Sequence, residues 1–241
     1  MFDIVIPVGP NDYGVVRGQL SYTMRNVIGY RRIYLVGHQV PSIEGTVAIE
    51  ESIFPFDLST VARAHGSGPR NGWYLQQLIK LYAGQTIPGI LDRYLVIDAD
   101  TFFLHQTTFE CPDGRPMYNY GTEYHTPYFD HIERLIPGLA RQDVSVSGIC
   151  HHMMFDRSYV AEIIQTVELA HGRSFHSVFL DSVVRTEPSG ASEYELYFNY
   201  MVSNHSDAIV VRRLNWANTR VIPSCDHNFS YVSCHWYMRR S

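Results

Sequence analysis

The fold is decided by the stretch YLVIDADTFFL, residues 94–104. Its first four residues, Tyr94 to Ile97, form a continuous apolar run of the length expected for a strand that is buried on both faces. Asp98 and Asp100 follow directly where this strand ends. In parallel α/β sheets, ligands bind at the carboxyl ends of the strands. The stretch therefore predicts a buried strand that delivers two carboxylates to a ligand site.

The residues before this stretch alternate between strand and helix patterns. Apolar runs predict strands, and apolar positions at helical intervals predict helices. Strands are expected at 2–8, 33–36 and 46–49, and helices at 15–28 and 73–83. The order strand, helix, strand, strand, helix, strand predicts an α/β fold with a mostly parallel central sheet and helices on both faces. The turn-rich residues 7–12 and the Asp98 turn should then lie at the same edge.

The second half of the chain has a less regular pattern. Residues 64–69 are small and are expected to form a loop, and the strand character of residues 144–155 is interrupted at Ser147 and Gly148. Further helices are expected at 159–171 and 192–202, and strands at 208–212 and 229–233. No internal repeat or linker divides the chain. We therefore expect one domain over 1–241, with a first half at 1–104 and a second half at 105–241.

Composition excludes several classes of protein. The 241 residues are 45% hydrophobic and 18% charged, as in ordinary globular proteins, and the formal net charge is -5. A protein that grips nucleic acid normally needs a basic face, so no nucleic-acid partner is expected. No apolar stretch reaches the roughly 20 residues of a membrane span.

Location is predicted from the first residues and the cysteines. The sequence starts with no basic leader or signal-peptide core. Four cysteines without CxxC spacing are expected to be reduced structural thiols: Cys111, Cys150, Cys225 and Cys234. A cytoplasmic location is the expectation, which would be the host cytoplasm if the protein is viral.

The acidic pair predicts a divalent metal. Two carboxylates one residue apart at the exit of a buried strand repel each other unless a cation or hydrogen-bond donors offset the repulsion. Oxygen ligands of this kind suit Mg²⁺ or Mn²⁺, which readily bridge protein carboxylates and a diphosphate. Such an ion would neutralise a departing nucleoside diphosphate as a Lewis acid.

Two other interpretations of the pair stay open at this point. Asp98 and Asp100 can be solvated side chains of a turn that follows a strand. A strand ending in Asp-x-Asp-Thr also resembles the first motif of haloacid-dehalogenase phosphatases, in which the first Asp is the nucleophile. Those enzymes usually begin with this motif, whereas almost a hundred residues precede it here, and no Gly-Asp-x-x-x-Asp follows.

Several segments together resemble glycosyltransferases of the GT-A (Rossmann-like) fold, particularly the chlorovirus capsid-glycan enzymes and related bacterial polysaccharide transferases. The resemblance spans nearly the whole chain in the order that the fold requires. It is carried by DIVIPV (residues 3–8), RNGWYLQQLIKL (70–81), YLVIDADTFF (94–103), SGICHHMMF (147–155) and SEYELYF (192–198). The first half would then bind the nucleotide and the second half the acceptor.

This resemblance implies a nucleotide-sugar donor, with a UDP-sugar as the first expectation, and a Mn²⁺ or Mg²⁺ cofactor. Asp98 would contact ribose or metal, Asp100 would be the firmer metal ligand, and His235 would complete the metal site, with His227 in reserve. The donor would also contact Pro7, Val8, Gly9, Arg70, Gln77, Lys80 and His152. Of the adjacent His151 and His152, at most one should enter the site, because neighbours on an extended segment point to opposite faces.

Three carboxylates are candidates for the catalytic base that an inverting transferase needs: Glu193, Glu195 and Asp181. Glu193 and Glu195 also open a helix that Ser192 can cap, where acidic residues are favourable for dipole reasons alone. The expected activity is transfer of a sugar to a hydroxyl of a glycan or glycoprotein. A non-catalytic nucleotide- or carbohydrate-binding module is the third hypothesis.

Overall fold

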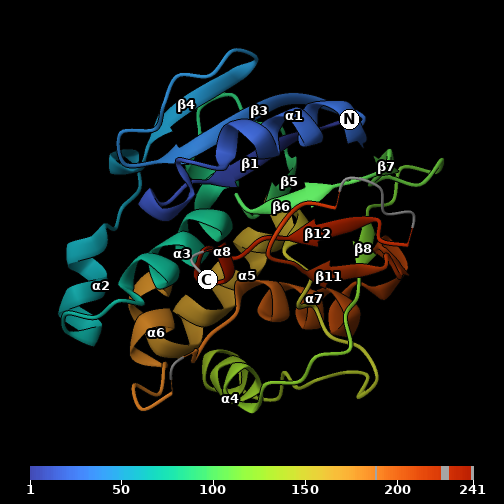
Figure 1. Ribbon diagram of the computed structural model, residues 1–241. Helices are drawn as coiled ribbons and strands as arrows, with labels where there is room; N and C mark the ends of the chain where they lie inside the picture. Colours follow the sequence, from blue (N-terminus) through green and yellow to red (C-terminus); the bar gives the residue numbers. More distant parts are fainter. Residues whose placement is uncertain (188, 224–227, 240–241) are drawn as a thin grey trace.

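The computed structural model describes residues 1–187, 189–223 and 228–239, and it is built around a five-stranded sheet (Figure 1). The strand order is β4-β3-β1-β5-β9. All neighbouring strands are parallel except β9, which runs antiparallel to β5. The strands are β1 (Phe2–Pro7), β3 (Tyr30–Gly37), β4 (Thr46–Glu50), β5 (Arg93–Ile97) and β9 (His152–Asp156). The prediction of a mostly parallel sheet is confirmed.

The central strands are apolar because both of their faces are covered. Every residue of β1 is buried, and Ile4 pairs with Ile33 on one side and with Leu95 on the other. The edge strand β4, in contrast, has no buried residue. The apolar runs of the sequence therefore mark the middle of the sheet.

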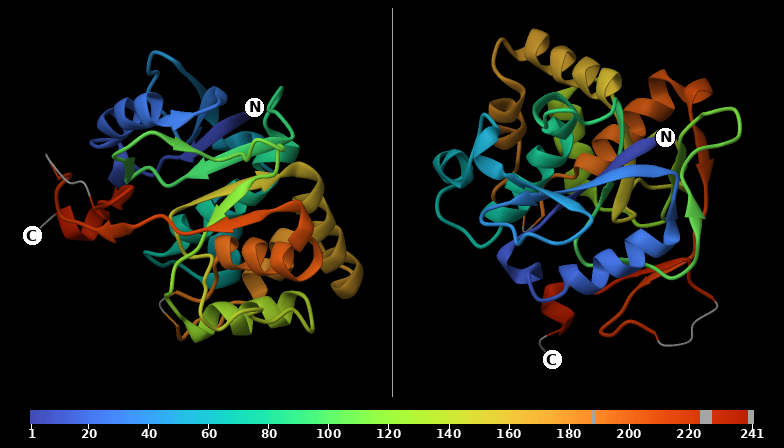
Figure 2. Two further views of the ribbon diagram at one scale, coloured as in Figure 1. Left: turned by 90° about the vertical axis from the view of Figure 1, so that its right-hand side faces the viewer. Right: turned by 90° about the horizontal axis from the view of Figure 1, so that it is seen from above.

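Helices cover both faces of the sheet (Figure 2). The helix α1 (Val16–Asn26) lies on one side, and α3 (Asn71–Thr86), α5 (Arg157–His171) and α7 (Glu193–Asn204) gather on the other. Two of these begin at a polar cap, since Asp156 accepts from Ser158 and Ser192 accepts from Glu195. The remaining larger helices, on the α3 side, are α2 (Leu58–His65), α4 (Thr126–Leu135) and α6 (Phe175–Asp181).

Short strands build a second layer beside the end of β5. The strand β6 (Thr101–Phe103), which follows the acidic pair, runs antiparallel to β12 (Tyr231–Ser233), and β12 pairs with β11 (Trp216–Asn218). The chain then ends its described part in α8 (Trp236–Arg239). Smaller pairs are formed by β8 (Met117–Asn119) with β10 (Val210–Arg212) and by β2 (Val27–Ile28) with β7 (Thr107–Thr108).

The structure departs from the sequence expectations in the less regular parts. The expected loop at 64–69 is partly helical, because α2 extends to His65 and stops at Gly66, whose φ of 76° suits glycine. Of the expected strand at 144–155, only the part from His152 onward forms β9. No described helix is both long enough and apolar enough to cross a membrane. Cys111, Cys150 and Cys234 are free thiols, and Cys225 lies outside the described residues.

A buried histidine on α4 makes stability depend on pH. His131 is fully buried, its Nε2 lies 2.8 Å from the carbonyl oxygen of Phe179, and burial lowers its pKa to about 4. The unfolded chain takes up this proton near pH 6.5. Stability is therefore expected to fall as the pH drops from about 6.5 to about 4, by on the order of 3 kcal/mol for this residue.

Urea unfolding of the wild type and of His131→Gln at pH 7 and pH 4.5 checks this expectation. The variant should lose less stability than the wild type between the two pH values. His38→Gln, which changes an exposed imidazole, is the matched control and should behave as the wild type. Equal acid sensitivity of His131→Gln and the wild type would contradict the assignment.

Candidate functional site

Two loops meet at the carboxyl edge of the sheet. The strands β1 and β5 are parallel neighbours, with Val5 paired to Val96, so the loop after β1 and the turn after β5 leave the sheet side by side. The loop after β1 runs through Gly9 into the short 3-10 helix η1 (Pro10–Asp12). Gly9 lies against α3, since a Cβ built on it would be 2.9 Å from Gln76 Nε2. A larger side chain at this position would have to displace the end of the Gln76 side chain.

The Asp98 carboxylate is held by three side chains, from α3, from α7 and from the segment just before β9. Lys80 Nζ of α3 lies 2.6 Å from Oδ1, and the hydroxyl of Tyr194 in α7 donates to the same oxygen at 2.8 Å. His151 Nδ1 lies 3.4 Å from Oδ2. Burial opposes ionisation, but Lys80 and His151 hold the pKa of Asp98 well below its ordinary value. Asp98 is therefore an ionised carboxylate in a fixed position.

Lys80 is a buried cation between two carboxylates. Its Nζ lies 2.6 Å from Asp98 Oδ1 and 2.6 Å from Glu193 Oε1, and 4.3 Å from the ring centre of Tyr194. Burial disfavours the charged amine, yet the two carboxylates raise the pKa of Lys80. Burial also raises the pKa of Glu193, which Lys80 offsets in part. The ion triad fixes α3, α7 and the end of β5 to one another.

Asp100 faces the C-terminal part of the chain. The antiparallel pairing of β6 with β12 sets Ser233 opposite Thr101, which brings Ser233 Oγ to 3.1 Å from Asp100 Oδ1. His235 Nδ1 lies 3.2 Å from Asp100 Oδ2. Burial lowers the pKa of His235, but the hydrogen bond to Asp100 and the charges of Asp100 and Asp98 raise it overall. The Asp100 carboxylate therefore stabilises the charged form of the His235 imidazole.

An ion pair joins the first and last parts of the site. Arg239 Nη2 of α8 lies 2.6 Å from Asp12 Oδ1, and both side chains are largely buried. Burial raises the pKa of Asp12, and the negative charges of Asp100 and Asp98 add to this. Three carboxylates thus lie close enough to influence one another. Figure 2 shows the red C-terminal segment near the blue helical segment that contains α1 in both views.

The residues around Asp100 suit a divalent cation that a ligand helps to hold. No group of three His, Cys, Asp or Glu side chains in 1–187, 189–223 and 228–239 has the arrangement of a complete metal site. Asp100 and His235 nevertheless offer an oxygen and a nitrogen side by side, and magnesium is commonly bound by one or two carboxylates together with substrate phosphates. His151 Nε2 is also buried without a hydrogen-bond partner among the described residues, so it can still bind a ligand.

The adjacent histidines face opposite sides. His151 adopts a left-handed backbone (φ 58°) and touches Asp98, His235 and Trp216, with ring centres 5.0 Å from His235 and 4.8 Å from Trp216. His152, the residue predicted to contact the donor, is instead buried among aromatic rings, and burial lowers its pKa to about 3. The structure therefore brings His151, rather than His152, to the acidic pair.

The predicted catalytic carboxylates have different environments. Glu193 belongs to the site through Lys80. Glu195 is buried two residues further on, where it binds the Ser147 hydroxyl, the Gly148 amide at 3.0 Å and Asn199 at 2.9 Å, so it holds the loop before β9. Asp181 lies at the surface end of α6 in an ion pair with Arg173 at 2.5 Å. Of the three, only Glu193 lies at the acidic pair.

The other residues that were predicted to contact the donor or the metal also lie in different environments. Gln77 is buried one turn before Lys80, and neither amide atom has a hydrogen-bond partner among the described residues. Arg70 precedes the first residue of α3 without a side-chain capping hydrogen bond, and it is exposed with its guanidinium over the ring of Trp73. Pro7 and Val8 are buried at the end of β1. His227 lies outside the described residues.

Several site residues were not identified from the sequence. Tyr194 stands between two glutamates that were the candidates there, Ser233 follows apolar residues, and Asp12 and Arg239 lie far apart in the sequence. The only sequence signal for Asp12 was its position in the turn after the first strand, which the edge rule already marked. Arg239 gave no such signal, because its partner is set by the return of the chain through β12 and α8.

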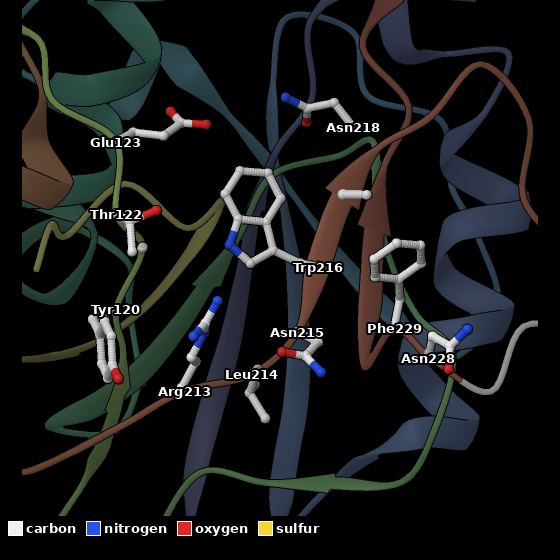
Figure 3. A pocket seen from close by; sticks show the side chains of 12 residues that line it. Tyr120, Thr122, Glu123, Arg213, Leu214, Asn215, Trp216, Asn218, Asn228 and Phe229 are labelled. Atoms are coloured by element: carbon white, nitrogen blue, oxygen red, sulfur yellow. The ribbon is translucent and has the colours of Figure 1, made fainter.

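A pocket of about 470 Å³ is drawn in Figure 3, and its lining residue Trp216 connects it through His151 to the acidic pair. Trp216 forms part of its wall and stacks on Tyr231, with ring centres 5.8 Å apart and an 8° angle between the rings. The same indole touches His151, which links the pocket to Asp98. The described lining comes from 120–123, 213–218, Asn228 and Phe229. A ligand in the pocket would therefore lie beside the carboxylates.

The comparisons with known proteins agree with this architecture. Among solved structures, the chain is similar to the crystal structure of mouse xyloside xylosyltransferase 1 in its apo form, with a TM-score of 0.50 and 10% identity, over 96% of this chain and 97% of that chain. At this identity the likeness shows the fold, which is one found in a glycosyltransferase. No curated protein matches the sequence. A family model described as "Family of unknown function (DUF6492)" matches residues 35–220, well over half of the chain, and the chain therefore belongs to the DUF6492 family.

Proposed function

We propose that this protein is a glycosyltransferase that moves a sugar from a nucleoside-diphosphate donor, a UDP-sugar first, to a hydroxyl of a glycan or glycoprotein. The observation that supports this most is the pairing of Asp100 with His235 next to the fixed Asp98 carboxylate, at the sheet edge where ligands bind. The fold shared with a xylosyltransferase adds support.

The donor would lie at the sheet edge where the loop after β1 meets α3 and the acidic pair. Gly9 allows the loop to approach α3 closely, and the buried amide of Gln77 has hydrogen-bonding capacity that the described residues leave unused. Lys80 and Tyr194 keep the Asp98 carboxylate ionised and in place. Because these groups are fixed before binding, they orient the donor without a further entropic cost.

The metal would be held by Asp100 and His235, with Asp98 beside them. When bound, a divalent ion supplies positive charge to the departing diphosphate. Among the chain's own residues, the ammonium of Lys80 also places positive charge near this position, whereas His235 must be neutral to bind the metal. Because Nδ1 of His151 faces the Asp98 carboxylate, its unused buried Nε2 can accept a hydrogen bond from a hydroxyl of the donor.

The chemical step joins the acceptor oxygen to the anomeric carbon. The bond from this carbon to the diphosphate oxygen breaks, and the diphosphate keeps the electron pair. The acceptor hydroxyl loses its proton to a base. Glu193 is paired with Lys80, so it positions Asp98 through that cation. Glu123, an exposed carboxylate in the Trp216 pocket, is the group that can take the proton.

Thermal unfolding with a panel of nucleotides tests the proposal. UDP or GDP at about 100 times its Kd, with Mn²⁺, should raise the Tm by roughly 5–10 °C. Asp113→Asn, which changes a surface carboxylate, should show the same shift, and Asp100→Asn should lose the part that depends on Mn²⁺. If no nucleoside diphosphate changes the Tm in the presence of Mn²⁺, the proposed donor is wrong.

The same samples separate the alternatives. A haloacid-dehalogenase-type phosphatase would release phosphate from simple phosphate esters and carry it on Asp98, although this carboxylate is already bound by Lys80, Tyr194 and His151. A non-catalytic module would bind UDP but never hydrolyse a UDP-sugar. The narrower resemblance to the chlorovirus capsid-glycan enzymes and the cytoplasmic location stay predictions.

A further inference from the structure

Trp216 gives the pocket beside the acidic pair an aromatic surface, and two other rings hold this indole in place. Trp216 stacks on the buried ring of Tyr231, and its edge contacts His151 at 4.8 Å between ring centres. These contacts fix the indole, which is half-buried and lines the pocket. Fixed indole rings are suited to the apolar face of a sugar, since they offer a large surface with little conformational entropy to lose.

Charges of opposite sign lie on either side of this aromatic surface. Figure 3 shows Glu123 and Arg213 pointing toward Trp216 from opposite ends of the pocket. They make no ion pair with each other within the described part of the chain, and among the described lining residues they are the two that carry charge. The rest of the polar lining is neutral and includes Asn215, Asn218 and Asn228.

Arg213 is turned to the pocket by the strand before it. Arg212, the last residue of β10, contacts the ring of Phe109 at 5.2 Å and binds the carbonyl of Thr108. Adjacent side chains on extended backbone point to opposite sides, so Arg213 faces outward into the pocket. It is exposed, and no ion pair or hydrogen bond of its guanidinium occurs within the described part of the chain. The guanidinium is free to bind an acidic group of a ligand.

We infer that this pocket binds an acceptor sugar that carries a carboxylate or a phosphate, with the ring on Trp216 and the acidic group on Arg213. This inference rests on the proposed function, which it deepens by naming the acceptor class. Glu123 lies at the end opposite Arg213, so the hydroxyl opposite the acidic group is the one presented to the donor. The nucleotide has its own place, because no residue of the loop after β1 lines this pocket.

Binding of three small probes to the full chain tests the inference. Methyl glucoside, methyl glucuronide and glucose 6-phosphate share one ring and differ in charge, and their Kd values can be measured by NMR titration without donor or metal. The wild type should bind at least one charged probe about tenfold more tightly than the neutral one, as expected for one charge-assisted pair. Comparing the two charged probes distinguishes a carboxylate from a phosphate.

Variants connect this preference to the pocket. Arg213→Gln should bind all three probes equally, and Trp216→Ala should weaken all three while its Tm confirms that it is folded. Arg17→Gln removes an exposed guanidinium on α1 and should keep the full preference. Equal binding of the probes by the wild type, binding of none, or a preference that survives Arg213→Gln would overturn the inference.

Nucleotide binding by the same samples keeps the two proposals apart. If UDP or GDP binds with Mn²⁺ and the charge preference is absent, the acceptor class is wrong and the proposed function stands. If the charge preference is present and no nucleotide binds, the proposed donor is wrong. The pocket then binds an acidic sugar for another purpose, and its assignment as an acceptor site is wrong as well.

Discussion

Replacing Lys80 with methionine is expected to lower the free energy of unfolding by about 3–5 kcal/mol, the cost of breaking a buried ion pair. The ammonium is the shared partner of Asp98 and Glu193, at 2.6 Å from each. Methionine fills a similar volume but leaves two neighbouring carboxylates facing each other in a buried place. Urea unfolding at pH 7 measures the loss, and sugar transfer should fall with it because Asp98 keeps only Tyr194 and His151 of its three partners.

A second substitution tests whether unpaired charge causes the loss of stability in Lys80→Met. Glu193→Gln added to Lys80→Met removes one of the two unpaired charges, so the double variant should be more stable than Lys80→Met alone. Arg70→Gln, at the exposed start of the same helix, should change stability by no more than about 0.5 kcal/mol. A loss below about 1 kcal/mol in Lys80→Met would show that the triad contributes little.

Asp100→Asn is expected to reduce kcat by roughly 10³-fold while the fold is kept. Asparagine has the shape of aspartate and can still accept from Ser233, so the stability change should stay near 1 kcal/mol. It lacks the charge that a metal ion and His235 require. Turnover of a UDP-sugar under saturating Mn²⁺, together with the Tm, measures both effects.

Ser233→Ala separates the charge of Asp100 from its position. This variant removes one hydrogen bond of 3.1 Å to the carboxylate and leaves the pairing with His235. We expect a decrease in kcat well below that of Asp100→Asn. Full activity of Asp100→Asn, or of the wild type in excess chelator, would contradict the metal role of this carboxylate.

The central sheet could be predicted because its signal is local. The apolar runs that became β1, β3 and β5 are buried on both faces, so each reads as a strand without knowledge of its neighbours. The edge rule then placed the loop after β1 beside Asp98 and Asp100, which the parallel pairing of β1 with β5 confirms. The family resemblance also led to His235, which lies against Asp100.

The features that the sequence did not predict depend on contacts between distant segments. The antiparallel β9 and the left-handed His151 decide which histidine faces Asp98, and an unbroken extended segment would have given a different orientation. Tyr194 looked like one more core ring, because only the packing of α7 against α3 brings its hydroxyl to Asp98. The helix α2 was missed because its cap, Asp57 with Thr60, was not recognised as a start signal.

The ion pair between Asp12 and Arg239 joins residues 227 positions apart. During translation, the strands from β1 to β9 have left the ribosome well before α8, and at about 5–20 residues per second the delay is on the order of ten seconds. Until then Asp100 has neither Ser233 nor His235 beside it. A nascent chain can thus hold its sheet while the candidate site around Asp100 is still incomplete, and this site is assembled only when the last of these residues has been synthesised.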